Sequence, residues 1–74
     1  MNMTNTTNYN TAPLTDAVVK LTGEDGNAFA ILGRMRRAIR SSNHPELAAV
    51  FLQEATSGDY NHLLATCMRY ATVE

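Results

Sequence analysis

The segment NAFAILGRMRRAIRSS, residues 27–42, has the clearest periodicity in the chain and constrains the fold most. Successive residues of an α-helix are about 100° apart, and this spacing separates the apolar side chains from the arginines. The sequence therefore predicts a helix with one buried face and one basic face, which we call the arginine face. The expected buried arc comprises Ala28, Ile31, Leu32, Met35, Ala38 and Ile39, and the arginine face comprises Arg34, Arg36, Arg37 and Arg40.

Two further helices are predicted by the residues that begin and end them. Pro45 suits a first helical turn, where its missing N–H is not needed, and Asn43 with Glu46 forms a variant of the capping box. We expect this helix over residues 45–56, with Gly58 as its C-terminal cap. Asp59 or Ser57 then caps a third helix over residues 60–70. The expected apolar stripes are Leu47, Val50, Phe51 and Ala55 in one helix, and Tyr60, Leu63, Leu64, Cys67 and Met68 in the other.

Short β-strand patterns flank the helices on both sides. In residues 16–22, Val19 and Leu21 alternate with polar residues, and Ala71 and Val73 alternate in the same way near the end of the chain. A two-stranded ribbon is marginal in water by itself, so its strands need helices on one face. The sequence predicts a small α+β domain, ordered β-α-α-α-β, with three helices packed on one face of a short two-stranded sheet.

The length of 74 residues allows one domain. Residues 1–13 are rich in Asn and Thr and carry no charged side chain, so we predict a disordered tail there and a single domain over residues 14–74. A domain of this size is marginally stable, and self-association often supplies the missing stability. Two open strand edges also favour a homo-oligomer.

Cysteine content and hydropathy predict the cellular setting. Cys67 is the only cysteine, which excludes a disulfide within the chain, and no signal-peptide pattern precedes Lys20. Both observations point to a reducing, cytoplasmic environment. The longest apolar runs are far shorter than the ~20 residues that span a bilayer, so no membrane association is expected.

The arginine face is the strongest candidate for a binding site. Its four members lie within seven residues, and no acidic residue lies three or four positions from them within the helix. Such a cluster suits the phosphates of a nucleic acid or another anion. The formal net charge of −1 provides no global positive field, so any such contact must be local. The alternative is a solvated face, or one paired with acidic residues of the later helices: Glu46, Glu54 or Asp59.

The segment GEDG, residues 23–26, is predicted to be a turn between strand and helix. It is too short for a calcium loop and lacks the lysine of a phosphate-binding loop. Asn27 or Asp25 can cap the helix that follows, and Glu24 lies near its positive end.

Few residues could support catalysis or bind a metal. His44, His62 and Cys67 lack the paired spacing of zinc ligands, so we expect no metal site and no cofactor. His62 with Asp59 could form an acid–base pair, although a capping aspartate beside a surface histidine is the alternative. Cys67 lies on an apolar stripe, where it would pack as a small hydrophobe. No nucleophile–base set is visible, so we do not expect an enzyme.

Two blocks of the chain resemble a known family. Residues 19–40, VKLTGEDGNAFAILGRMRRAIR, and residues 51–74, FLQEATSGDYNHLLATCMRYATVE, are similar to short, uncharacterised bacterial and phage-encoded proteins. That family has Asp where this chain has Asn61, and the Asn/Thr-rich tail lies outside its pattern. The resemblance implies one autonomous unit, and it implies no activity, cofactor or partner.

The functional prediction follows from architecture rather than from a motif. We expect a non-catalytic interaction module that self-associates or binds another protein. The alternative is a nucleic-acid-binding accessory protein that uses Arg34, Arg36, Arg37 and Arg40 of the arginine face.

Overall fold

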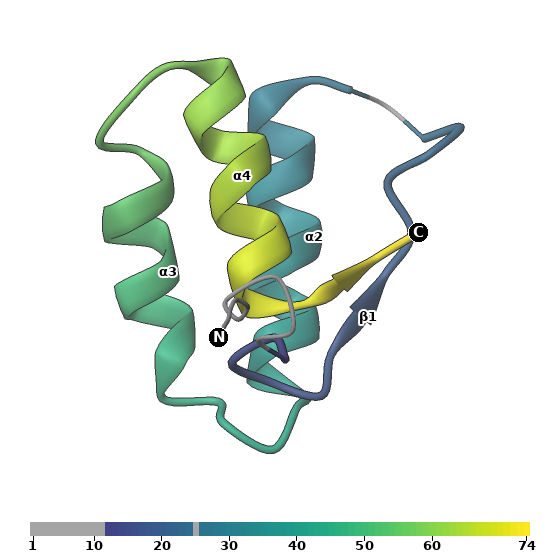
Figure 1. Ribbon diagram of the computed structural model, residues 1–74, viewed down its shortest axis with the longest axis vertical. Coiled ribbons are helices and arrows are strands. Elements are labelled where there is room, and N and C mark those ends of the chain that lie inside the picture. The colour runs from purple at the N-terminus through teal and green to yellow at the C-terminus, as the bar shows by residue number, and fades with distance from the viewer. Residues whose placement is uncertain (1–11, 25) are drawn as a thin grey trace, which may run out of the picture.

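The computed structural model describes residues 12–24 and 26–74, which form three helices and a short sheet (Figure 1). The predicted α+β class and the predicted order of elements are confirmed. Most of the predicted tail, residues 1–13, lies outside the described residues, as does Asp25. In chain order the elements are β1 (Val18–Val19), α2 (Ala28–Arg40), α3 (Leu47–Ala55), α4 (Tyr60–Tyr70) and β2 (Thr72–Val73).

The sheet consists of two parallel strands. β1 pairs directly with β2, with Val18 opposite Thr72 and Val19 opposite Val73. Parallel strands cannot be joined by a tight turn, so the three helices together form the crossover connection. Figure 1 shows the helices gathered on one side of the strands, as the sequence predicted. α2 contacts β1, α4 contacts β2, and α3 packs against both helices.

Helix α2 forms because its sequence supplies both an N-terminal capping residue and an apolar face. The Asn27 side chain accepts hydrogen bonds from the N–H groups of Phe29 and Ala30, at 2.8 and 3.2 Å, which confirms Asn27 as the N-cap. The predicted arc is largely correct. Its buried members are Ile31, Met35 and Ile39, its half-buried members are Leu32 and Ala38, and Ala28 is exposed.

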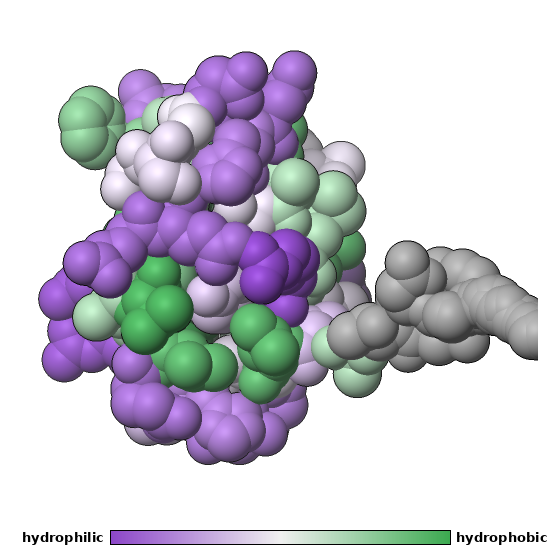
Figure 2. Space-filling view, turned by 60° about the vertical axis from the view of Figure 1, so that its left-hand side comes forward, coloured by the Kyte–Doolittle hydropathy of each residue, from purple (hydrophilic) through white to green (hydrophobic). Residues whose placement is uncertain are grey.

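The predicted start and stripe of α3 are wrong in detail. The helix begins at Leu47, and no capping box forms, because the side chain of Asn43 bonds to Asp16 instead. Ala48 is buried in place of Val50, which is 47% exposed. Apolar residues occur on every side of this helix, so its neighbours rather than its own periodicity determine which of them are covered. On the α3 side of the molecule, hydrophobic groups accordingly emerge among hydrophilic ones (Figure 2).

Helix α4 has the predicted bounds but a shifted buried face. Leu63 and Cys67 are buried as expected, whereas Met68 is 61% exposed and Tyr60 is also exposed. Tyr70, which is not part of the predicted stripe, is buried, with its ring edge-on to Phe51 at 5.4 Å between centroids. The shift arises because α4 contacts both α3 and β2. The buried positions are Leu63, Thr66, Cys67 and Tyr70.

Glycine does not cap α3 as the sequence predicted. That helix ends at Ala55, and Gly58 does not adopt the left-handed conformation of a C-terminal glycine cap. Instead Gly58 makes room for the ring of His62, because a Cβ atom on Gly58 would lie 2.8 Å from the ring's Cγ. Among described residues, positive φ occurs at Gly23, where the chain turns from β1 towards α2 with φ of 79°.

Candidate functional site

Within the described part of the chain, one of the four arginines of α2 is paired with an acid. Arg34 is half-buried and lies 3.6 Å from a carboxylate oxygen of Glu24. The other three, Arg36, Arg37 and Arg40, are exposed and form no ion pair with any residue in 12–24 or 26–74. The predicted basic face therefore exists, with three of its four cations available at the surface.

The acids that the sequence offered as partners are engaged elsewhere. Glu46 pairs with the ring of His44 at 3.0 Å, and Glu54 pairs with Arg69. The carboxylate of Asp59 accepts a hydrogen bond of 2.9 Å from the His62 N–H and thereby caps α4. The predicted pairing of the arginine face with these three acids is therefore wrong. Glu24 neutralises one arginine instead, across the glycine turn.

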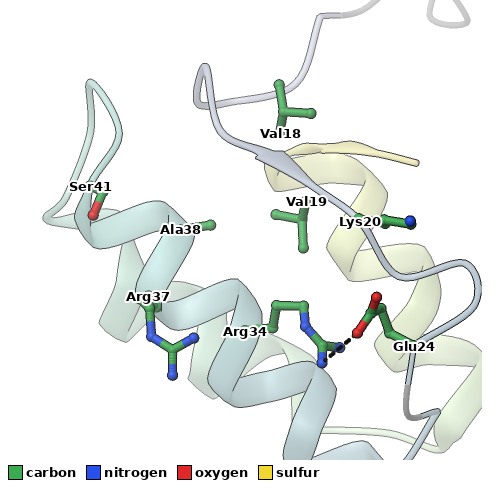
Figure 3. Close-up of a pocket in the computed structure, with 8 residues that line it drawn as sticks. All are labelled: Val18, Val19, Lys20, Glu24, Arg34, Arg37, Ala38 and Ser41. Carbon is green, nitrogen blue, oxygen red and sulfur yellow. Dashed lines mark ion pairs between the residues drawn. The ribbon is translucent and has the colours of Figure 1, made fainter.

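The arginine face is divided into two surfaces, because its members lie at different angles around the helix. Arg36 and Arg40 lie on the α3 side and line an open groove of about 470 Å³, which we call the α3 groove. Arg34 and Arg37 line a second groove of about 440 Å³ on the other side, which we call the β1 groove. The α3 groove is completed by Pro45, Glu46, Ala48, Ala49 and Leu52. The β1 groove is completed by Val18, Val19, Lys20, Glu24, Ala38 and Ser41 (Figure 3).

The two grooves differ in their electrostatics. In the α3 groove a backbone hydrogen bond and the adjacent His44 ring hold the pKa of the Glu46 carboxyl below its ordinary value, so an anion accompanies the two arginines. In the β1 groove three cations accompany one acid, Glu24. The β1 groove is therefore the more positive of the two.

Arg34 is incompletely satisfied in the β1 groove. Its Nη1 atom is buried and has no hydrogen-bond partner in the described part of the chain. A buried donor without an acceptor costs about 1–3 kcal/mol. Figure 3 shows the guanidinium pointing towards Glu24, whereas Ala38 points towards Val19. In the same view the Arg37 side chain extends away from the strand. Ala38 therefore lies between the helix and the strand.

One edge of the sheet is also unpaired, a feature that the sequence pattern could suggest but not locate. The carbonyl groups of Ala17 and Val19 accept hydrogen bonds of 2.9 and 2.8 Å from the β2 side. Backbone groups of successive strand residues point to alternate edges, so those of Val18 and Lys20 point away from β2. We call this the open edge of β1. It borders the β1 groove, because Val18 and Lys20 both line that groove.

His62 does not form an acid–base pair with Asp59, because the contact between them uses the backbone N–H of His62. The His62 ring is directed to the end of α3 instead. Its Nε2 atom lies 2.8 Å from the carbonyl oxygen of Glu54 and 3.2 Å from the hydroxyl of Ser57. His62 therefore ties α4 to the C-terminal end of α3.

Cys67 is fully buried in the core, as its apolar stripe predicted. Burial raises the pKa of its thiol to about 11. A thiol with such a pKa is almost entirely protonated at neutral pH, and the thiolate is the reactive form. This position favours a packing role.

Comparisons with known proteins add no assignment. No family model matches the chain, and neither a curated protein nor a solved structure matches it. In the described residues, no group of three or more His, Cys, Asp or Glu side chains is arranged to hold a metal ion. None of the helices in that part of the chain is long and apolar enough to cross a membrane.

Proposed function

We propose that this protein is a non-catalytic interaction module that binds an anionic partner through the basic side of α2. The proposal rests on the three exposed arginines, Arg36, Arg37 and Arg40, which form no ion pair in the described part of the chain. A guanidinium group with free donors can bind a carboxylate or a phosphate with two parallel hydrogen bonds.

The environments of the potentially reactive side chains support a non-catalytic role. The thiol of Cys67 is buried and its pKa is raised. The ring of His62 is engaged by the end of α3. Catalysis by a thiolate would require Cys67 to be accessible, and catalysis by His62 would require its ring to leave the end of α3.

Nucleic acid is the second candidate partner. Three exposed arginines within five residues of one helix can each contact a phosphate, and phosphate contacts supply most sequence-independent affinity. The net charge of −1 and the division of the arginines between two grooves favour a small contact area over a long backbone track.

Self-association remains a proposal for the same module. It is supported by the open edge of β1 and by the small core. Charge repulsion opposes self-association, because two copies paired through that edge would bring their basic grooves together. A cytoplasmic setting and the bacterial or phage origin implied by the resemblance likewise remain predictions.

The test of the anionic partner uses two polymers that differ in chemistry. Binding of fluorescent poly-glutamate and of a short single-stranded oligonucleotide is measured at low and at high salt. We expect binding at low salt to weaken as salt rises, and Arg37→Gln to reduce the slope. Arg69→Gln is the matched control, because it removes one cation from α4 rather than from α2. Failure of both polymers to bind at low salt would refute the proposal.

A further inference from the structure

The open edge of β1 and the groove beside it have the features of a peptide-binding site. We propose that an extended, acidic segment of a partner protein binds in the β1 groove and adds to β1 as a third strand. This proposal rests on the function proposed above and specifies the partner: an acidic polypeptide in the β-conformation, recognised by its backbone and by its carboxylates.

The hydrogen-bonding groups of the edge favour a polypeptide. Val18 and Lys20 each present one N–H and one C=O group to the open edge, so the edge offers two donors and two acceptors. Val18 is 59% exposed, and no strand or loop within 12–24 and 26–74 pairs with these groups. A peptide backbone supplies both the acceptors and the donors that they need, whereas a phosphate backbone supplies acceptors alone.

The same edge already pairs with another segment of the protein at Asp16, two residues before Val18, where the groove begins. The N–H of Asp16 donates to the Asn43 side-chain oxygen at 2.9 Å, and the N–H of Asn43 donates to the Asp16 carboxylate at 2.9 Å. The loop between α2 and α3 therefore covers the edge at Asp16 and ends there. The segment from Val18 to Lys20 remains open, a length of ~10 Å at about 3.3 Å per residue.

The charge of the groove favours an acidic segment. Among the described residues, Lys20, Arg34 and Arg37 line it together with one acid, Glu24. An added strand would direct alternate side chains towards α2, above the small side chain of Ala38. Carboxylates at those positions would lie within reach of Arg37, because its exposed guanidinium forms no ion pair among the described residues and can turn towards the groove.

A second copy of this chain fits the groove less well. Pairing two open edges would place Lys20, Arg34 and Arg37 of both copies around one seam, against only the two Glu24 carboxylates. The Asn/Thr-rich residues 1–11 carry no acidic side chain that could offset this charge. The positive charge of the β1 groove therefore favours an acidic partner protein over a second copy of this chain.

The test is a titration of the full chain with a defined probe, followed by amide NMR. The probe is an acetylated and amidated heptapeptide, Thr-Glu-Val-Glu-Val-Glu-Thr, which alternates its acids as a strand does. We expect the amide signals of Val18 and Lys20 to shift, and their hydrogen exchange to slow, as the edge becomes paired. If the signals of both residues stay unchanged at millimolar peptide, the proposal is wrong.

Three changes separate strand addition from general attraction between charges. N-methylation of alternate peptide bonds in one register removes the N–H groups that pair with the edge and should abolish binding, whereas N-methylation in the other register removes outward-facing N–H groups and should leave binding largely intact. Replacement of the glutamates by glutamine should weaken binding by roughly tenfold, since each exposed ion pair contributes up to about a fivefold factor. Equal binding by the two N-methylated peptides, or by the glutamine and glutamate peptides, would contradict the proposal.

Protein variants locate the contact within the arginine face. Arg37→Gln should weaken binding by roughly threefold to fivefold, whereas Arg36→Gln, on the same helix but in the α3 groove, should have little effect. Glu24→Gln should tighten binding by a similar factor, because it removes an acid that lines the β1 groove. Equal effects of Arg36→Gln and Arg37→Gln, or weaker binding by Glu24→Gln, would overturn the assignment.

The other occupants of the edge give distinct results. An oligothymidylate that shifts the Val18 and Lys20 amides and displaces the peptide would refute the peptide site while supporting the anionic-partner function. Shifts of these amides with protein concentration alone would assign the edge to a second copy and refute the proposal. Binding of poly-glutamate without any change at Val18 and Lys20 would refute the peptide site and leave the basic side of α2 as the contact surface.

Discussion

The hydroxyl group of Tyr70 offers the sharpest test of what holds α4 against α3. It donates a hydrogen bond of 2.9 Å to one carboxylate oxygen of Glu54, while the other oxygen pairs with Arg69. The substitution Tyr70→Phe removes this bond and keeps the ring that packs edge-on against Phe51. Its effect on stability therefore measures a single interaction between the two helices.

The expected cost follows from the charge and exposure of the acceptor. A hydrogen bond to a charged group contributes about 1.5–3 kcal/mol. The Glu54 side chain is 28% exposed and retains its pairing with Arg69, so water can compensate for part of the loss. We therefore expect Tyr70→Phe to lower the free energy of unfolding by about 1–1.5 kcal/mol. For a domain of this size, that loss lowers the midpoint of thermal unfolding by about 4–12 °C.

The measurement is urea unfolding followed by circular dichroism, with Tyr60→Phe as the matched control. The Tyr60 hydroxyl donates to the carbonyl of Gly26 at 2.6 Å, but this side chain is exposed and water can replace its bond. We expect the control to cost less than about 0.5 kcal/mol. A double-mutant cycle with Glu54→Gln should give a coupling energy of about 1 kcal/mol. The reasoning fails if the two Tyr→Phe changes cost the same, or if the loss is unchanged when Glu54 is already glutamine.

Three further predictions concern positions where the structure fixes the sign of the effect. Gly33→Ala should stabilise the protein by about 0.5–1 kcal/mol, because Gly33 is helical and an added Cβ would meet no atom within 4 Å. Gly23→Ala should destabilise it by about 1–2 kcal/mol, because φ is 79° at Gly23; thermal unfolding distinguishes these opposite signs. The thiol of Cys67 should resist Ellman's reagent at neutral pH in the folded protein and react after unfolding in urea. Stability should also fall as pH rises from about 9 to about 11, because the thiol ionises first in the unfolded chain, and Cys67→Ala should remove this part of the pH dependence.

The elements that could be predicted from the sequence are those with local causes. Asn27 and Asp59 cap their helices because each side chain accepts a hydrogen bond from an N–H group two or three residues ahead. The buried face of α2 follows from its 3.6-residue period, since arginines occupy its other side from Arg34 to Arg40. The caps and the period each lie within one helix, so predicting them requires no knowledge of the fold.

The errors occur where the neighbours of a helix determine its environment. Ala48 and Val50 in α3 are both apolar, and only the packing against α2 and α4 decides that Ala48 is buried. Asn43 was predicted to cap α3, but its side chain bonds to Asp16, which lies 27 positions away in the sequence. Local patterns cannot distinguish a side chain that caps its own helix from one that joins two segments.

The candidate site shows the same division. The four arginines were recognisable from spacing alone, whereas the pairing of Arg34 with Glu24 depends on how the glycine turn folds back towards α2. The open edge of β1 was not locatable, because the pairing of β1 with β2 joins the two ends of the domain. Which edge remains unpaired is a property of that long-range contact.

The amino-acid sequence by itself determined the class and order of the elements, the caps of α2 and α4, and the existence of a basic face, because each depends on residues within a few positions of one another. The tertiary structure alone decided that this face divides into two grooves, that Arg36, Arg37 and Arg40 lack acidic partners among the described residues, and that one groove adjoins an open strand edge. These features depend on which distant segments meet, and packing of the whole domain sets those contacts.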